Sequence, residues 1–322
     1  MPTHSCQYGR LPDFIIGGAP KCGTTSLHFI LDQNQDISMP EQEVHFFDAD
    51  DPITHPDFLG VDSGQLRWLD VGTPDDETLK WYAGQFAPHT KARLIGEDST
   101  TYIFSEVAAA RIAALLPEVK LIFVLRDPVK RAYSQYWHLV RSARISTSFE
   151  TAISAHTSII LGSTYAPHLR RYIEMFGRDR VRIVLFEEFL ADQQGTIDQL
   201  TDYLGAERFT LSEGKTWFNR TYYPTKPRLQ NLINRVGSPI VSRRYRHHMG
   251  AADTPGQQAM AKLHYRWFRY INPILLKDTK PPPMQVETHK YLTQHLRARN
   301  EGLEAICGKT LGALWPTFAD NP

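Results

Sequence analysis

The stretch FIIGGAPKCGTTSLHFILD, residues 14–32, decides the fold of this chain. It opens with a short apolar run, residues 14–19, which predicts a β-strand, and residues 24–32 then follow the pattern of a helix. A strand, a tight glycine-rich loop and a helix in this order direct backbone N–H groups at an anion. The stretch therefore predicts a phosphate-binding loop.

The rest of the chain repeats the alternation of strands and helices. Further strands are expected at residues 94–97, 120–126 and 181–186. Helices are expected at residues 105–116, 128–142, 166–176, 192–204, 256–270 and 288–307. The alternation predicts an α/β fold, a single P-loop-like domain in which helices flank a central parallel sheet. We expect one domain over residues 1–322, with its core motifs in 13–230 and a helical C-terminal region in 231–322, and linkers at 237–255 and 277–283.

Composition narrows the class of protein. A chain of 322 residues with 42% hydrophobic side chains can bury one large core. The formal net charge of +1 supplies no global field for nucleic acid, so any anion site must be local. The three cysteines, Cys6, Cys22 and Cys307, show no CxxC pair, which argues against a disulfide framework or a metal site. No signal peptide or membrane span is evident, and a cytoplasmic location is expected.

The glycine-rich loop differs from the Walker loop of kinases in the place of its lysine. The Walker pattern GxxxxGK[ST] would put lysine at position 24, where this chain has threonine, and Lys21 stands three residues earlier. A kinase also needs a carboxylate for Mg²⁺ at the end of a later strand, whereas the strand at 120–126 ends in Arg126. A cation there suits a second phosphate. The residues expected to bind a nucleotide through this loop are Lys21, Cys22, Gly23, Thr24, Thr25 and Ser26.

Two motifs together resemble the sulfotransferases that use 3′-phosphoadenosine 5′-phosphosulfate (PAPS). PKCGTTSL, residues 20–27, is similar to their 5′-phosphosulfate loop, and LRDPVKRAYSQYWH, residues 125–138, is similar to their 3′-phosphate motif. The resemblance implies that Arg126 and Ser134 hold the 3′-phosphate, and that Lys21 neutralises the departing adenosine 3′,5′-bisphosphate (PAP). It further implies in-line displacement without a metal.

A third motif, EQEVHFFD at residues 41–48, resembles the KE-x-HFFD segment of the heparan sulfate 3-O-type and related carbohydrate sulfotransferases. The resemblance implies that Glu43 is the general base and that His45 and Asp48 support it. In an extended segment, alternation would turn Glu43 and His45 to one face. The choice between Glu43 and His45 as the base stays open.

Two departures from that group bear on the acceptor. Gln42 stands in place of the group's lysine, and EDSTTY at residues 97–102 replaces a lysine-containing segment. Both changes remove positive charge that a polyanionic acceptor would need. We expect a neutral or less charged acceptor, a hydroxyl or amine of a glycan, lipid or small natural product.

The remaining similarities concern the scaffold and a loop over the nucleotide. Residues 162–176 resemble a scaffold helix, with Tyr165 expected in the core, and residues 215–221 resemble the stretch that precedes the covering loop. In that loop, Lys226 and Arg228 are candidates to reach the 3′-phosphate.

Other classes of function remain open. A P-loop small-molecule kinase would depend on Mg²⁺, and a non-catalytic nucleotide-binding scaffold would bind PAP without transfer. The basic and aromatic residues 261–270 would suit peripheral contact with a membrane, although an ordinary amphipathic helix is the simpler reading. The sequence does not specify the oligomeric state.

Overall fold

A central parallel sheet organises the molecule. The computed structural model describes residues 5–211, 222–245, 259, 262, 263, 266, 270, 275–278 and 280–319. The sheet has five strands in the order β4-β7-β3-β8-β9, and every neighbouring pair is parallel. The strands are β3 (Phe14–Gly18), β4 (Ile37–Ser38), β7 (Leu94–Asp98), β8 (Lys120–Leu125) and β9 (Val181–Leu185). The parallel sheet and four of its strands confirm the prediction, and the two-residue edge strand β4 was too short to show a pattern.

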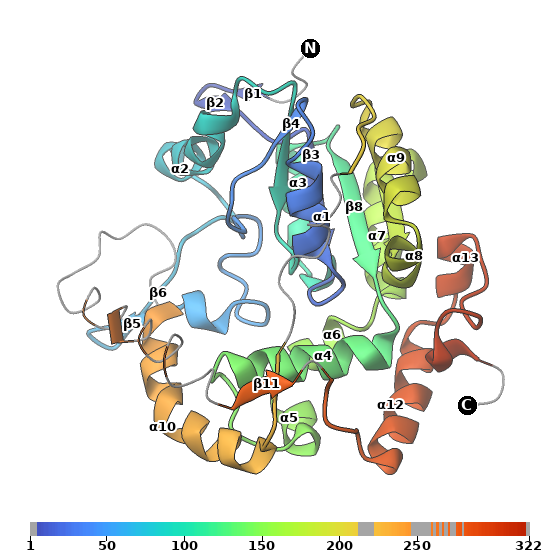
Figure 1. Cartoon of the computed structure of the whole chain (residues 1–322). Helices are drawn as coiled ribbons and strands as arrows, with labels where there is room; N and C mark the ends of the chain where they lie inside the picture. Colours follow the sequence, from blue (N-terminus) through green and yellow to red (C-terminus); the bar gives the residue numbers. More distant parts are fainter. Residues whose placement is uncertain are drawn as a thin grey trace.

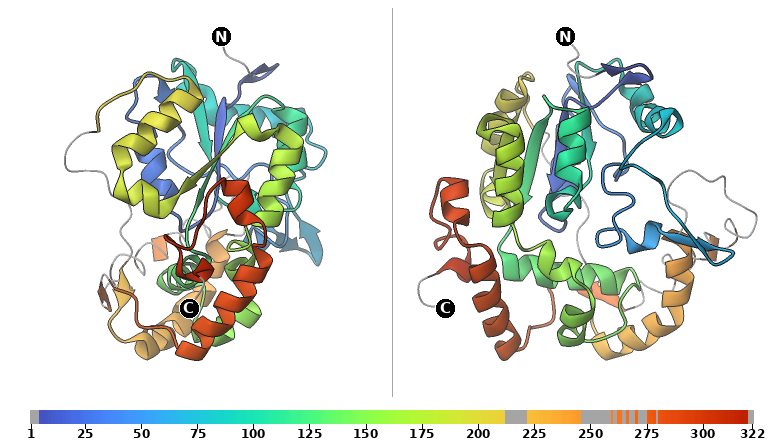
Figure 2. Two further views of the ribbon diagram at one scale, coloured as in Figure 1. Left: turned by 90° about the vertical axis from the view of Figure 1, so that its right-hand side faces the viewer. Right: turned by 180° about the vertical axis from the view of Figure 1, so that it is seen from behind.

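Helices cover both faces of this sheet, which is why the strands are apolar without alternation. In Figures 1 and 2, α1, α8 and α9 lie on one face, and α3 and α7 lie together on the other. These helices are α1 (Thr24–Leu31), α3 (Ala108–Leu115), α7 (Ala166–Phe176), α8 (Phe186–Ala191) and α9 (Gln193–Leu204). Helix α4 (Pro128–Arg141) crosses below the carboxyl ends of the strands (Figure 1).

Several shorter elements gave no clear signal in the sequence. They are β1 (Ser5–Cys6), β2 (Gly9–Arg10), β5 (Gly60–Asp62), β6 (Gln65–Arg67), α2 (Asp76–Phe86), α5 (Phe149–Ala155) and α6 (Ser158–Leu161). The strands among them have two or three residues, and α5 and α6 are shorter than two helical turns. A periodic pattern cannot be read over so short a length.

The C-terminal region differs from the expected run of helices. It contains α10 (Pro227–Tyr245), α12 (Val286–Arg299) and α13 (Leu303–Cys307), and β10 (Tyr223–Pro224) pairs antiparallel with β11 (Leu276–Asp278). The single helix expected at 288–307 is wrong, because the chain turns after α12 and Gly302 adopts a left-handed φ of 78°. The helix expected at 256–270 lies largely outside the described residues, as does most of the basic stretch 242–248.

The linker expected to begin at residue 237 is also wrong. Helix α10 continues to Tyr245, and its first half is held against the α4 region by Asn234. The Asn234 side-chain amide donates to the backbone carbonyls of Val140 and Ile145 at 2.7 and 2.9 Å. Tertiary hydrogen bonds of this kind stabilise a helix whose Gly and Pro residues give it low intrinsic propensity.

Candidate active site

A cleft of about 680 Å³ opens at the carboxyl ends of β3, β7 and β8. In open parallel sheets, ligands bind at this edge, where the loops after neighbouring strands converge. Its walls come from the loop after β3, the segment before α2, the residues after β7 and the start of α4. Of the residues proposed from the sequence, those that line the cleft are Lys21, Gly23, Thr24, Thr25, Ser26, Glu43, His45, Arg126 and Ser134.

The glycine-rich loop presents the N-terminus of α1 to this cleft. Gly23 is the N-cap residue with a left-handed φ of 89°, and no side chain caps the helix there. A side chain at this position would place its Cβ 2.7 Å from the Phe186 ring, so glycine is required both by conformation and by space. A helix N-terminus without a side-chain cap, next to a lysine, is suited to an anionic group.

Lys21 lines the cleft close to other cations. Burial and, to a lesser extent, the neighbouring charges of Arg141, Arg126 and Arg131 together lower its pKa to about 8. The Arg126 guanidinium donates to the backbone carbonyl of Lys21 at 3.2 Å and lies over the Phe186 ring, 5.0 Å from its centre. An anion bound here would relieve the repulsion among these cations.

Arg126 and Ser134 come from the turn between β8 and α4. The Asp127 carboxylate accepts from the backbone N–H of Lys130 at 2.9 Å, and Pro128 occupies the first turn, so α4 begins at once after the strand. This places Ser134 nearly two turns into the helix, on the same cleft as Arg126. The pair is arranged to hold a second anionic group.

Two buried side chains brace the loop from behind, and sequence reasoning did not assign them that role. Arg131 is fully buried and donates from Nε to the Pro20 carbonyl at 3.0 Å. Tyr165 is also fully buried, as expected, and its hydroxyl donates to the Arg126 carbonyl at 2.9 Å. The absence of a side chain at Gly162 leaves room for the Arg131 guanidinium.

Glu43 and His45 also line the cleft and form an ion pair there. His45 Nε2 lies 2.9 Å from Glu43 Oε2, and the Thr100 hydroxyl donates to the same carboxylate at 3.1 Å. The segment is not extended as expected, because His45 adopts a left-handed φ of 52°. The two side chains meet through this turn of the backbone and not through strand alternation.

The pair shifts the pKa of each partner toward the charged form. Burial would raise the pKa of Glu43, but the charge and hydrogen bond of His45 and the bonds from Thr100 outweigh it and lower that pKa. Burial would lower the pKa of His45, but the charge and hydrogen bond of Glu43, with the charges of Asp48 and Asp98, raise it. The pair therefore favours the ionised form of Glu43 and the protonated form of His45.

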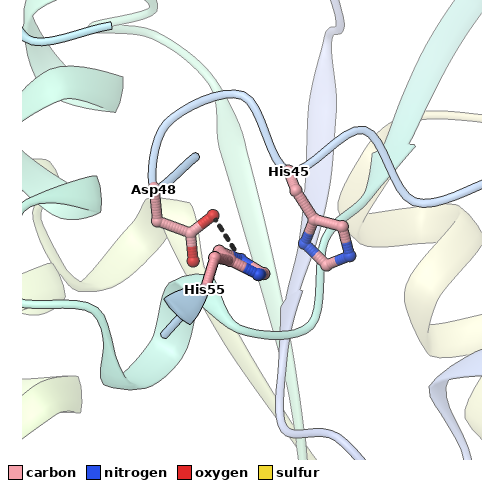
Figure 3. A group of neighbouring side chains, drawn as sticks. All are labelled: His45, Asp48 and His55. Atoms are coloured by element: carbon pink, nitrogen blue, oxygen red, sulfur yellow. Dashed lines mark hydrogen bonds and ion pairs between the residues drawn. The ribbon is translucent and has the colours of Figure 1, made fainter. Parts of the chain in front are cut away.

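Asp48 and His55 lie next to His45 (Figure 3), and the Thr101 hydroxyl contacts both histidine rings. His55 Nε2 lies 3.0 Å from Asp48 Oδ1 and 3.1 Å from Thr101 Oγ1, and Thr101 Oγ1 lies 3.2 Å from His45 Nδ1. The potential ligand atoms of His45, Asp48 and His55 fall within 4.8 Å of one another. His45 Nδ1 and His55 Nε2 both already have a hydrogen-bond partner in Thr101. We therefore interpret this group as a hydrogen-bond network. That no metal takes part stays a prediction.

The segment after β7 supports the backbone of His45. Glu97 is fully buried and accepts hydroxyl hydrogen bonds from Tyr82 and Tyr102, both at 2.6 Å, and from Ser99 at 2.9 Å. Ser99 Oγ in turn accepts the N–H of His45 at 2.9 Å. Burial raises the pKa of Glu97, although these hydrogen bonds act to lower it. The acid that begins EDSTTY is thus part of the scaffold.

Asp98 belongs to EDSTTY, the segment expected to replace a lysine-containing one. It is buried and lies 3.4 Å from His28 Nδ1 on α1. Burial, opposed by His28 and reinforced by the charge of Glu43, raises its pKa to about 6. Asp98 is thus a second acidic group near Glu43.

Three residues proposed from the sequence are not brought to the cleft. Cys22 is fully buried, its N–H donates to the Ala19 carbonyl at 3.3 Å, and its thiol lies 3.9 Å from the Tyr165 hydroxyl. Lys226 and Arg228 are exposed at the start of α10 and do not line the cleft. The stretch 215–221 lies outside the described residues.

The chain matches the model of a known protein family. Residues 12–210 match the model described as the sulfotransferase family. A human heparan sulfate glucosamine 3-O-sulfotransferase 3B1 is 28% identical over 221 residues, covering 66% of this chain and 50% of that protein. A human bifunctional heparan sulfate N-deacetylase/N-sulfotransferase 2 is 29% identical over 222 residues, covering 62% of this chain and 22% of that protein. The chain thus spans half or less of the length of these relatives.

A solved structure matches most of the chain. The crystal structure of a sulfotransferase from Alicyclobacillus acidocaldarius has a TM-score of 0.57 and 26% sequence identity, and the match covers 94% of this chain and 98% of that one. In the part of the chain that the structure describes, no helix is both long and apolar enough to span a bilayer.

Proposed function

The chain belongs to the sulfotransferase family, and on this premise we propose that it transfers a sulfuryl group from PAPS to an acceptor hydroxyl or amine by in-line displacement. The observation that carries the proposal is a single cleft lined both by a lysine-bearing phosphate loop and by a hydrogen-bonded carboxylate, Glu43. Sulfuryl transfer needs two features in one cleft. One is an anion site for the leaving group, and the other is a base for the nucleophile.

The loop and Arg126 would hold the donor. The N-terminus of α1 suits the 5′-phosphosulfate, and Arg126 with Ser134 suits the 3′-phosphate. Lys21 would neutralise the bridging oxygen as charge develops on it. Holding donor and acceptor in line accounts for roughly 7 to 11 kcal/mol of the barrier.

Glu43 would take the acceptor proton. The acceptor oxygen forms a bond to sulfur, the bond from sulfur to the bridging oxygen breaks, and that electron pair leaves with PAP. The one hydroxyl proton of Thr100 cannot serve both oxygens of Glu43, so Oε1 keeps the capacity to accept a proton. His45 Nε2 faces Oε2 at 2.9 Å and would stabilise the carboxylate there.

We propose that the acceptor is uncharged where it meets this cleft. Apolar side chains contribute to the cleft wall next to His45, where Phe58 lies edge-on to the His45 ring with centres 5.9 Å apart. The apolar residues of this wall are Pro52, Ile53, Pro56, Phe58 and Phe104. Asp98 adds acidity near Glu43, whereas Lys21 and Arg126 line the cleft from the phosphate loop and the turn after β8. An alcohol of a glycan, lipid or small natural product, with an apolar portion beside it, fits this wall better than a sulfated polymer does.

Binding of PAP provides the first test. PAP should stabilise the folded protein without Mg²⁺, by about 2.7 kcal/mol at 100 times its dissociation constant, and Arg126→Ala should reduce that stabilisation. A thermal shift with ATP and Mg²⁺ but none with PAP would favour the kinase instead. Asp98 at the end of β7 has the position of a kinase carboxylate, but it pairs with His28 and does not line the cleft.

Transfer itself requires an acceptor screen. Incubation with PAPS and panels of neutral alcohols, phenols, amines and sulfated oligosaccharides should give products heavier by about 80 Da, the mass that sulfation adds. Products confined to the sulfated oligosaccharides would overturn the proposed acceptor. PAP binding without any product would favour the non-catalytic scaffold.

A further inference from the structure

His55 occupies a place that no motif of the sequence identified. It lies in the loop before α2, ten residues after His45, and its ring stacks on Phe58 with centres 4.2 Å apart and planes 6° apart. The His45 and His55 rings meet edge-on with centres 4.6 Å apart. His55 is 8% exposed and Asp48 is 0% exposed, so the charges and protons of this pair are shielded from water.

The hydrogen bonds determine where the protons of the group must be. An ionised carboxylate only accepts, so the 3.0 Å contact between Asp48 Oδ1 and His55 Nε2 requires a proton on that nitrogen. Since the nitrogen then cannot accept from Thr101 at 3.1 Å, the Thr101 hydroxyl proton is left to face His45 Nδ1 at 3.2 Å. A neutral His45 in this arrangement must carry its single proton on Nε2, which faces Glu43 at 2.9 Å.

The same network accommodates a charged His45. If both ring nitrogens carry protons, Nδ1–H donates to the Thr101 oxygen, which has two lone pairs, and Nε2–H still donates to Glu43. A proton therefore remains on Nε2 in either state. Without the network, the other neutral tautomer would present a bare nitrogen to Glu43 and could bond only to a protonated carboxyl group, which is useless as a base.

We propose that His55, held by Asp48 and acting through the Thr101 hydroxyl, is a positioning residue that keeps a proton on His45 Nε2 and thereby keeps Glu43 ionised for proton abstraction. This inference rests on the proposed sulfuryl transfer. It concerns His55 and Thr101, whose roles neither the sequence motifs nor the family match supplies.

The groups that face His45 from each neighbouring element set the direction of the pH effect. They are Glu43, Asp48 and His55 on the loop before α2, and Glu97 and Asp98 on β7. All are acids except His55, so loss of the Nε2 proton would leave Glu43 among uncompensated acids and raise its pKa. The acidic limb of the kcat profile would then move to higher pH.

Matched substitutions separate the hydrogen bonds from packing. His55→Phe keeps a ring against Phe58 but removes the N–H, whereas His55→Gln restores an N–H near the position of Nε2. Thr101→Val keeps the shape but removes the hydroxyl, whereas Thr101→Ser keeps it. His295→Phe, at an exposed position of α12, controls for the same change elsewhere.

Three readouts apply to each variant. Nitrogen-15 chemical shifts of the His45 ring report its tautomer and need no turnover. Steady-state kinetics with PAPS give kcat, the donor KM and their pH profiles, and calorimetry with PAP reports both folding and donor binding.

His55→Phe and Thr101→Val should shift the His45 tautomer toward Nδ1–H and lower kcat by about 10- to 100-fold. This loss is smaller than the loss expected when the general base itself is removed. The donor KM and PAP affinity should stay within about 2-fold, while the acidic limb moves to higher pH. His55→Gln and Thr101→Ser should recover most of the activity, and His295→Phe should match the parent protein. If one variant fails to fold, as seen by loss of PAP binding, the other tests the same link.

An unchanged His45 tautomer in both His55→Phe and Thr101→Val would overturn the proposal, whatever the activity. So would stoichiometric Zn²⁺ binding that His55→Phe abolishes and that activity requires, because the group would then be a metal site. If the tautomer shifts as expected but the parent protein transfers no sulfuryl group, the proposed function fails and the positioning of His45 stands.

Discussion

At the scale of single residues, the cleft separates two kinds of charge. Lys21 lines it from the phosphate loop and Arg126 from the turn after β8, whereas Glu43 lines it from the loop after β4. The ion pair with His45 lowers the pKa of Glu43, and burial together with the neighbouring arginines lowers the pKa of Lys21 to about 8. Substitutions of the cations and of the carboxylate should therefore have different kinetic signatures.

Glu43→Gln should lower kcat by about 10² to 10⁴ while PAP binds normally, because the carboxylate acts on the acceptor and not on the nucleotide. Rapid-quench or steady-state assays with PAPS, together with PAP calorimetry, would measure both effects. If His45→Ala abolishes transfer and Glu43→Gln stays active, histidine is the base and the role given to Glu43 is wrong.

The pH dependence of PAP affinity should report the pKa of Lys21. The pKa of about 8 in the free protein must rise when a phosphate binds next to the ammonium, so binding takes up a proton above that pH. PAP affinity should be nearly constant from pH 7 to 8 and then fall, by up to about tenfold per pH unit. Calorimetry across pH 7 to 9.5 would measure this, and Lys21→Ala should flatten the curve. An equally steep decline in Lys21→Ala would assign the titration to another group.

At the scale of elements, the phosphate loop depends on a buried contact between α4 and the turn after α6. Gly162, in the turn after α6, lets the Arg131 guanidinium of α4 reach both the loop carbonyl of Pro20 and the carbonyls of Ser158 and Ile159. Arg131 is fully buried and burial lowers its pKa, so its charge is tolerated only while these bonds are made.

Gly162→Ala should destabilise the protein and weaken donor binding together. An added Cβ would lie 2.5 Å from Arg131 Cζ, so the guanidinium must move and lose partners, at about 1 to 3 kcal/mol for each buried group left unpaired. Urea unfolding and PAP calorimetry would measure the two effects.

Gly84→Ala serves as the matched control, because no atom lies within 4 Å of its added Cβ and the residue is exposed in helix α2. It should be stabilising by about 0.5 to 1 kcal/mol. Losses of similar size in both variants would mean that the close approach of Arg131 is not the cause.

At the scale of the whole molecule, the C-terminal segment is built into the core that carries the site. Trp315 is fully buried within the same apolar cluster as β3 and β8, and its indole N–H donates to Glu187 at 2.7 Å. Glu187 and the backbone N–H of Thr317 both contact Asp127, directly after Arg126. The C-terminal residues thereby support the turn proposed to hold the 3′-phosphate, which favours the prediction of one folding unit.

Trp315→Ala should destabilise the whole protein by about 3 to 5 kcal/mol, since removal of a large buried side chain leaves a cavity and takes the indole hydrogen bond from Glu187. Tyr291→Ala, at a 52% exposed side chain, should change stability by less than about 0.5 kcal/mol. Scanning calorimetry would measure the stability of both variants, and PAP binding would report on the region that carries the cleft. A separate low-temperature transition in Trp315→Ala that leaves PAP binding intact would instead make the C-terminal segment an independent unit.

The sequence alone was sufficient for the features that depend on neighbouring residues. The strand, glycine loop and helix at 14–32, the helix at 166–176 and the turn that carries Arg126 all match the structure, because hydrophobic period and turn chemistry act over about ten residues. The same local reading put Cys22 on the nucleotide, although its side chain faces the core.

Only the tertiary structure decided what surrounds Glu43. Ser99 and Thr101 lie more than 50 residues from His45 along the chain, and His55 reaches Asp48 through an irregular loop. No periodic pattern describes such contacts, because they depend on which loops the sheet brings to its carboxyl edge and on the left-handed turn at His45. Hydrogen bonds between distant loops are settled by packing, and packing requires the whole fold.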